Sequence, residues 1–267
     1  MVGATLTRSE ANLMIVYFAG NSIDTDIPLR RVGIHYRIAS FYDIDRGQQD
    51  LDVLHDYRHV IVDSGLFALM FGAGAGEVTD EAGARRWMLR YVDYIRSCSL
   101  RRPTFVEVDS QCLIGSDATW ELRREFRSLV GPDVDVMNVY HLPDGNPDDL
   151  IDYADYIGVG MPELSRSLSR AERHRVVAYI ARKASAKGKR VHLLGTAEVR
   201  YLRDFSFCTS CDTSIWLNVA RFGQLRIPEF GTVKYPGAIK GERRWECLCA
   251  SARMVRSLAQ KYAGDQR

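Results

Sequence analysis

Short apolar segments alternate along this chain with segments that carry the pattern of amphipathic helices. The apolar segments are rich in Val, Ile, Phe and Tyr and are mostly continuous rather than interrupted by polar residues. That pattern is typical of strands whose two faces are both buried in a parallel sheet. Eight segments are expected to form strands: Leu13–Phe18, His59–Val62, Thr104–Val108, Val134–Tyr140, Tyr156–Val159, Arg190–Leu194, Phe205–Cys211 and Thr232–Tyr235.

The segments between the expected strands carry helix signals. Ser169 and Glu172 have the spacing of a capping box, and Gly188 provides a stop at the other end of that helix. Thr79 is expected to cap the helix that follows it. The repeated strand–helix alternation indicates an α/β fold, and eight strands fit a TIM-like (β/α)8 barrel. We expect residues 1–267 to form one domain, with a doubly wound open sheet as the alternative fold.

Length and charge exclude few functions by themselves. The chain has 267 residues, with 36 Lys and Arg against 34 Asp and Glu, so its formal net charge of +2 does not indicate any class of partner. No apolar run approaches the ~18 residues of a membrane span. The segment Met1–Asn12 is too polar for a signal peptide, so we expect a cytoplasmic protein with no membrane partner.

The 6 cysteines are too few for a disulfide scaffold in a chain of this length. Cys208 and Cys211, together with Cys247 and Cys249, offer four thiols for a structural zinc ion, but the second pair is separated by one residue where two are usual. Buried thiols that behave as small apolar side chains are the favoured interpretation. We therefore expect no metal and no cofactor, with this zinc site as a minor alternative.

Most of the expected strands end in a polar residue or a glycine. In a barrel of parallel strands these ends meet on one face, and that face holds the active site. Ordinary turn chemistry also places such residues after strands, so a single aspartate would carry little weight. Several carboxylates that converge are more informative, because clustered acids repel each other. The residues at these ends are Asp63, Asp109, His141, Gly160, Gly195 and Asp212.

The segment 221–267 is locally basic, with aromatic residues among the cations. That composition is typical of a surface that follows a nucleic-acid backbone, although a solvated basic helix would give the same pattern. The residues that we expect to contact nucleic acid are Arg221, Lys234, Lys240, Arg243 and Arg244.

Seven short motifs occur in barrel order between residues 63 and 223. They are Asp63-Ser64-Gly65, Glu107-Val108-Asp109, Tyr140-His141, Tyr156-Ile157-Gly158-Val159-Gly160, His192-Leu193-Leu194-Gly195, Cys211-Asp212-Thr213-Ser214-Ile215-Trp216 and Ala220-Arg221-Phe222-Gly223. Together they resemble the tRNA-guanine transglycosylase superfamily. The resemblance is greatest to its compact, phage-type DNA-guanine transglycosylase branch, which inserts 7-deazaguanine bases.

The resemblance implies roles for particular residues. Asp212 matches the nucleophile, which would displace guanine and form a covalent glycosyl-aspartate. Asp63 matches the second carboxylate, a general acid and base. Asp109 matches the aspartate that reads the N–H edge of the base. The other residues expected around the base are Ser64, His141, Gly158 and Gly160.

The chain departs from the tRNA enzymes after the barrel. They carry a Cys-x-Cys-x-x-Cys…His zinc site, whereas Cys247 and Cys249 are followed by no third cysteine and no histidine. This favours DNA as the substrate, with tRNA as the alternative. The implied function is a pentosyltransferase that exchanges guanine in DNA for a 7-deazaguanine such as preQ0, its partners being DNA and the free base. A non-catalytic nucleic-acid-binding barrel is a further alternative.

Overall fold

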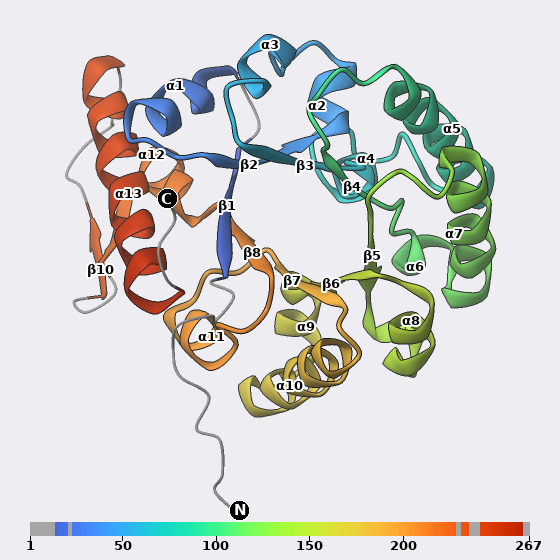
Figure 1. Ribbon diagram of the computed structural model, residues 1–267. Helices are drawn as coiled ribbons and strands as arrows, with labels where there is room; N and C mark the ends of the chain where they lie inside the picture. Colours follow the sequence, from blue (N-terminus) through green and yellow to red (C-terminus); the bar gives the residue numbers. More distant parts are fainter. Residues whose placement is uncertain (1–13, 21–22, 228–230, 235–240, 264–267) are drawn as a thin grey trace, which may run out of the picture.

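Eight parallel strands close into a barrel at the centre of the computed structural model (Figure 1). The structure describes residues 14–20, 23–227, 231–234 and 241–263. Neighbouring strands pair in chain order, and β1 pairs in parallel with β8, which closes the ring. The barrel strands are β1 (Ile15–Ala19), β2 (Tyr36–Ser40), β3 (His59–Asp63), β4 (Thr104–Val106), β5 (Val136–Tyr140), β6 (Tyr156–Gly160), β7 (Arg190–Leu194) and β8 (Ser210–Thr213).

Helices surround the strands on the outside of the barrel (Figure 1). The TIM-like (β/α)8 prediction is therefore confirmed, and the open-sheet alternative is wrong because β8 returns to β1. The helices are α1 (Ile23–Arg31), α2 (Phe41–Asp45), α3 (Leu51–Leu54), α4 (Leu66–Phe71), α5 (Glu81–Ser97), α6 (Gln111–Ile114), α7 (Ser116–Val130), α8 (Pro147–Tyr153), α9 (Met161–Ser167), α10 (Arg170–Ala186), α11 (Val199–Asp204), α12 (Asn218–Phe222) and α13 (Gly241–Tyr262), with 3-10 turns η1 (Leu142–Asp144) and η2 (Ile215–Leu217).

Two errors cancelled in the predicted strand count. The prediction omitted β2, and it counted Thr232–Tyr235 as a barrel strand. Residues Gly231–Lys234 instead form β10, which pairs antiparallel with β9 (Gln224–Ile227) outside the barrel. Leu13 and Tyr235, at the ends of two predicted strands, lie outside the described residues.

The strand β2 escapes prediction because its second residue, Arg37, is charged. Arg37 is completely buried, and its Nε donates to Asp26 Oδ1 at 2.8 Å. Its guanidinium also donates to the backbone carbonyl of Phe18 at 3.1 Å, so it is paired and hydrogen-bonded as a buried cation must be. The partners lie on other elements, and the local sequence does not reveal them.

One of the two predicted helix caps is confirmed, and the other is one residue away from its predicted position. Ser169 and Glu172 form the predicted capping box at the start of α10. Thr79 is not the cap of α5; the side chain of Asp80 accepts the backbone N–H of Gly83 at 2.7 Å instead. The strand predicted for Phe205–Cys211 begins only at Ser210 in β8, because Phe205 is the C-cap of α11.

Along each strand, every second side chain points into the barrel, and these side chains fill its interior. A layer of apolar side chains, with two tyrosines among them, closes the interior below the ends of the strands. The fully or almost fully buried members of this layer are Tyr17, Ile38, Ile61, Val106, Met137, Val139 and Tyr156. Polar inward-facing residues at the carboxyl ends of the strands are therefore left to line an opening above an apolar floor.

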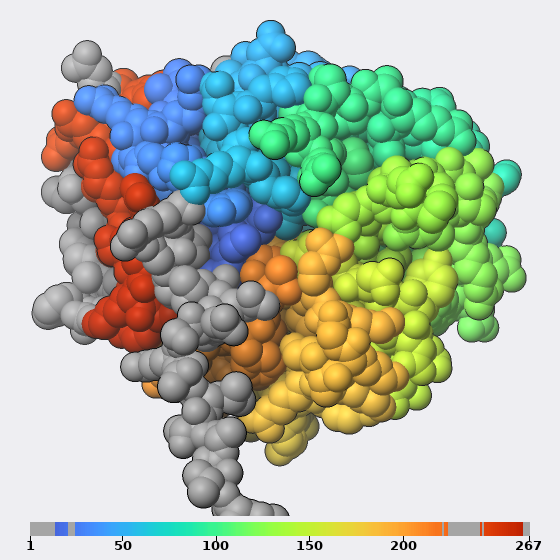
Figure 2. Space-filling view, in the orientation of Figure 1, coloured from blue at the N-terminus to red at the C-terminus, as the bar shows by residue number. Residues whose placement is uncertain are grey.

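The C-terminal helix α13 completes the outer ring beside α1 (Figures 1 and 2). The Arg256 guanidinium donates to the backbone carbonyl of Val32 at 2.7 Å, and Cys249 Sγ lies 3.9 Å from the carbonyl oxygen of Pro28. Much of the basic segment predicted after residue 221 is thus an outer helix of the barrel. That residues 1–267 form one domain stays a prediction. No helix within the described ranges is both long and apolar enough to cross a membrane.

Candidate active site

A cavity of about 450 Å³ opens at the carboxyl ends of the barrel strands. This is within the size range of small-molecule sites and is the face on which TIM barrels place their active sites. Every strand contributes a residue between the position before its last residue and three residues beyond its end. The lining includes Ala19, Ser40, Asp63, Asp109, His141, Gly160, Leu194 and Asp212.

Asp212 on β8 lines the cavity, and its carboxylate is held through one of its two oxygens. Its Oδ1 accepts from His192 Nε2 at 3.1 Å and from the backbone N–H of Gly195 at 2.5 Å. Gly195 follows β7 with φ of +79°, a left-handed conformation that glycine adopts without strain. Among the described residues, Oδ2 makes no hydrogen bond. The carboxylate is therefore held by one oxygen and has the other available to a reacting atom.

Asp63 at the end of β3 lines the same cavity and accepts the backbone N–H of Gly65 at 3.3 Å. Burial, followed by repulsion from Asp109 and Asp212, raises the pKa of Asp63 to about 7. Desolvation and like charges both disfavour the ionised form of a carboxyl group. Near neutral pH, Asp63 can therefore either give or take a proton, which is what a general acid and base must do.

His141 is held between two carboxylates. Its Nε2 lies 3.1 Å from Asp109 Oδ2, and its Nδ1 lies 2.6 Å from Glu163 Oε2 on α9. Burial favours the neutral ring, but the hydrogen bonds to Asp109 and Glu163 outweigh it and raise the pKa of His141 to about 10. At neutral pH the ring is an imidazolium that donates to both carboxylates, so Asp109 is fixed in place.

The backbone beneath Asp109 is also fixed by a buried ion pair. Glu107 accepts two hydrogen bonds from Arg123, at 2.7 and 2.8 Å, which join the end of β4 to α7. It also accepts from Asn138 at 2.6 Å and from the backbone N–H of Val139 at 2.8 Å. The glutamate of the Glu107-Val108-Asp109 motif therefore has a structural role, two residues before the aspartate that lines the cavity.

Of the four other residues expected around the base, two line the cavity and two do not. His141 and Gly160 are among the lining residues. Ser64 is buried, and its backbone carbonyl accepts from Trp87 on the outer side of β3. Gly158 lies one layer below the cavity, where an added Cβ would come within 3.1 Å of Met137. Neither the Ser64 side chain nor the Gly158 backbone is therefore placed to touch a ligand in the cavity.

The residues predicted to contact nucleic acid that the structure describes lie on several different elements outside the barrel strands. Arg243 and Arg244 are exposed on α13 and are not among the cavity residues. Arg221 lies in α12 and Lys234 in β10, while Lys240 is outside the described residues.

An exposed cation and an exposed aromatic side chain at the cavity were not predicted. Arg166 on α9 and Phe67 on α4 both line it. The Phe67 side chain is half exposed, and its ring centroid lies 5.4 Å from that of Phe71, which is also exposed. Planar apolar rings at an open site provide faces on which a nucleobase can stack.

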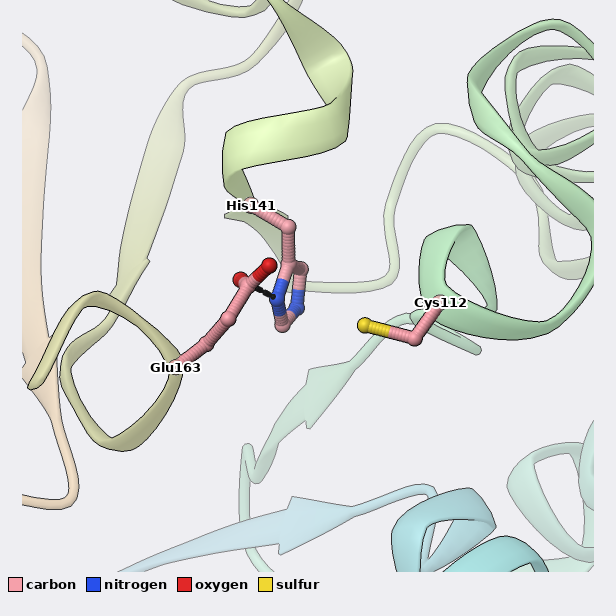
Figure 3. Close-up of side chains that lie close together, drawn as sticks. All are labelled: Cys112, His141 and Glu163. Carbon is pink, nitrogen blue, oxygen red and sulfur yellow. Dashed lines mark hydrogen bonds and ion pairs between the residues drawn. The ribbon is translucent and has the colours of Figure 1, made fainter. Parts of the chain in front are cut away.

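Possible metal ligands gather once in the described part of the chain. Ligand atoms of Cys112, His141 and Glu163 lie within 4.8 Å of one another (Figure 3). Both nitrogens of His141 are already hydrogen-bonded to carboxylates, so an ion would have to displace one of these contacts. The cysteines of the minor zinc alternative (Cys208, Cys211, Cys247 and Cys249) are buried and form no such group among the described residues.

Removing the charge of Glu163 should lower the pKa of His141. An opposite charge in direct contact shifts a pKa by roughly 1–3 units, so we expect Glu163→Gln to lower it by at least about one unit. An NMR titration of the ring protons measures this, with Glu121→Gln, an exposed glutamate on α7, as the matched control. An unchanged pKa in Glu163→Gln would show that the imidazolium does not depend on this contact.

Comparison with known proteins identifies no family. No protein-family model matches the chain, and no curated protein matches it. A structural match is the crystal structure of 2,3-dimethylmalate lyase, a PEP mutase/isocitrate lyase superfamily member, with 12% sequence identity and a TM-score of 0.41. The match covers 94% of this chain and 95% of that one. At this level of similarity, it carries no argument about what the present chain does.

Proposed function

We propose that this protein is an enzyme, a transglycosylase that exchanges guanine in DNA for a 7-deazaguanine such as preQ0. The observation that carries the proposal is the pair of carboxylates in one cavity. Asp212 has an available oxygen, and Asp63 changes its protonation state near neutrality. A nucleophile and an acid/base in the same cavity are the two groups that retaining glycosyl transfer requires.

The reaction takes place in two displacements at C1′ of the target nucleotide. Asp212 Oδ2 forms a bond to C1′, the bond from C1′ to guanine breaks, and the leaving base takes the electron pair and a proton from Asp63. The incoming base then loses a proton to Asp63 and bonds to C1′, while the ester bond to Asp212 breaks. Two inversions give net retention, and Asp63 returns to its initial state.

The residues around the carboxylates suit a purine-like base. Asp109, held by the His141 imidazolium, offers a fixed acceptor for the N–H groups of a guanine edge. Phe67 offers a ring face at the opening. Because the reacting bond of a paired nucleotide is inaccessible inside a duplex, the target nucleotide must be flipped out or presented in a single strand.

The choice of DNA depends on the sequence resemblance alone, which is greatest to the DNA-guanine transglycosylase branch. Incubation with labelled guanine, in parallel with DNA and tRNA, tests it. We expect label to enter DNA. Label in tRNA alone would show that the substrate of the same reaction is tRNA. Label in neither nucleic acid, with no released guanine, would favour the alternative of a non-catalytic nucleic-acid-binding barrel.

A further inference from the structure

A chain of buried hydrogen bonds lies directly behind Asp212. His192 Nε2 lies 3.1 Å from Asp212 Oδ1, and His192 Nδ1 lies 2.6 Å from Ser210 Oγ. Ser210 Oγ lies 2.6 Å from the hydroxyl of Tyr156. The backbone register fixes these partners, because His192 stands opposite Ser210 across the β7–β8 ladder.

The histidine cannot reorient without disturbing its neighbours. Its side chain is completely buried, and it meets the rings of Tyr17 and Tyr156 edge-on, at centroid distances of 6.1 and 6.3 Å. Each of its nitrogens has one polar partner, so neither is unsatisfied. A fully connected buried network of this kind holds its members in one arrangement.

The hydrogen bonds of this buried chain all run in one direction, from Tyr156 to Asp212. Burial raises the pKa of Tyr156, so this hydroxyl keeps its proton and can donate to Ser210. Ser210 can then donate its own proton to His192 Nδ1. An imidazole with its proton on Nε2 satisfies both contacts, since it accepts at Nδ1 and donates to Asp212 at Nε2.

We propose that His192, supported by Ser210 and Tyr156, is a positioning residue that holds Asp212 Oδ1 so that Oδ2 faces the reacting carbon. This inference rests on the proposed function, in which Asp212 is the nucleophile. The same donor stabilises the carboxylate that is released when the ester breaks, so His192 contributes to both displacements. It makes no contact with the cavity and is not expected to bind the base.

Kinetics separate positioning from binding. We expect His192→Phe to lower the rate of base exchange about 100-fold, as for loss of one preorganised donor, and to leave the KM for nucleic acid within about twofold. His192→Gln, whose amide N–H can still donate, should recover about tenfold of that loss. Tyr156→Phe should lower the rate about fivefold, because it removes one hydrogen bond two steps away.

A matched control has the same chemical change at another buried tyrosine. The hydroxyl of Tyr57 donates to Asp26 at 2.8 Å, on the α1 side of the fold. Tyr57→Phe removes that hydrogen bond without touching the chain behind Asp212, so the rate should stay at the wild-type value. If His192→Phe does not fold, Ser210→Ala and Tyr156→Phe, which keep the bulk of the buried side chains, take its place.

A spectroscopic measurement tests the chain of hydrogen bonds behind Asp212 independently of activity. Long-range proton–nitrogen NMR of histidine-labelled protein should show His192 protonated on Nε2, with a changed signal in Ser210→Ala and Asp212→Asn. A proton on Nδ1 would overturn the inference. So would a folded His192→Phe variant that exchanges bases at the wild-type rate, and that result would leave the proposed function intact. Absence of exchange and of any covalent adduct in the wild type would instead overturn the proposed function, and with it the nucleophile that His192 is inferred to position.

Discussion

Asp212→Asn should lose base exchange by at least about 10⁴-fold, the order expected when a covalent nucleophile is removed. The amide oxygen of asparagine can still accept from His192 and from the N–H of Gly195, so the arrangement around the residue is kept. The amide cannot supply the negative oxygen that attacks C1′. On denaturing gels, the nucleic-acid adduct formed by the wild type should therefore be absent in this variant.

The control for Asp212→Asn is the same substitution at an exposed position. Asp93 on α5 has a side chain that is 79% exposed, and its one ion pair within the described residues is a long one, 3.9 Å from Arg96. Asp93→Asn should form the adduct like the wild type. An adduct that persists in Asp212→Asn would assign the nucleophile to another residue, and Asp63 would be the first to examine because it lines the same cavity.

The barrel was predictable because its strands are nearly continuous apolar runs, and this pattern does not depend on distant partners. β2 was missed for the opposite reason. Arg37 can occupy a buried position in this strand only because Asp26 and several backbone carbonyls accept its hydrogen bonds. A single sequence gives no sign that these groups will meet.

The site was partly predictable from the rule that strand ends converge. It located Asp63, Asp109, His141 and Asp212 correctly in one cavity. Ser64, which the resemblance and not this rule placed beside the base, is not among the cavity residues, because the residue after an inward-facing strand residue faces outward. That alternation is readable in a sequence and would have excluded Ser64.

The residues that hold the cavity residues in place could not be predicted in the same way. Glu163 lies three residues beyond the end of β6, and the strand-end rule would have drawn attention to it. Its importance comes from contact with His141, which the sequence does not state. His192 occurs in one of the seven motifs, but the sequence does not distinguish a histidine that acts at the site from one that is satisfied in the core. Its role depends on a register across three neighbouring strands that only the folded barrel provides.

Asp63→Asn should lower the rate of adduct formation by about 10²–10⁴-fold, the contribution usual for general acid catalysis. The asparagine amide has no proton to give to the leaving base. In the wild type, adduct formation should fall as the pH rises above about 7, because the acid form of Asp63 is then lost. Single-turnover rates between pH 5 and 9 measure this, and a rate that does not fall up to pH 9 would remove Asp63 as the acid.

Resolution of the adduct should depend on pH in the opposite direction, since the incoming base must give its proton to ionised Asp63. The midpoint should also move to lower pH. Asp212 is an uncharged ester in the adduct, so one of the two carboxylates that raise the pKa of Asp63 no longer repels it. A common midpoint for both steps would contradict the assignment of Asp212 as the esterified group.

The same carboxyl group should make folding stability depend on pH even without substrate. The pKa of Asp63 is about 7 in the folded protein against an ordinary value of 3.8, so between these values the folded state holds a proton that the unfolded state has lost. The stability contributed by Asp63 is therefore fully present below about pH 4 and is lost as the pH rises to about 7. Asparagine cannot ionise, so Asp63→Asn should unfold at least about 3 °C above the wild type at pH 8, with the difference disappearing towards pH 4. Asp93→Asn should show no such trend, and an equal Tm for Asp63→Asn and wild type at pH 8 would mean that Asp63 carries no penalty for its charge and is ionised too readily to serve as the acid.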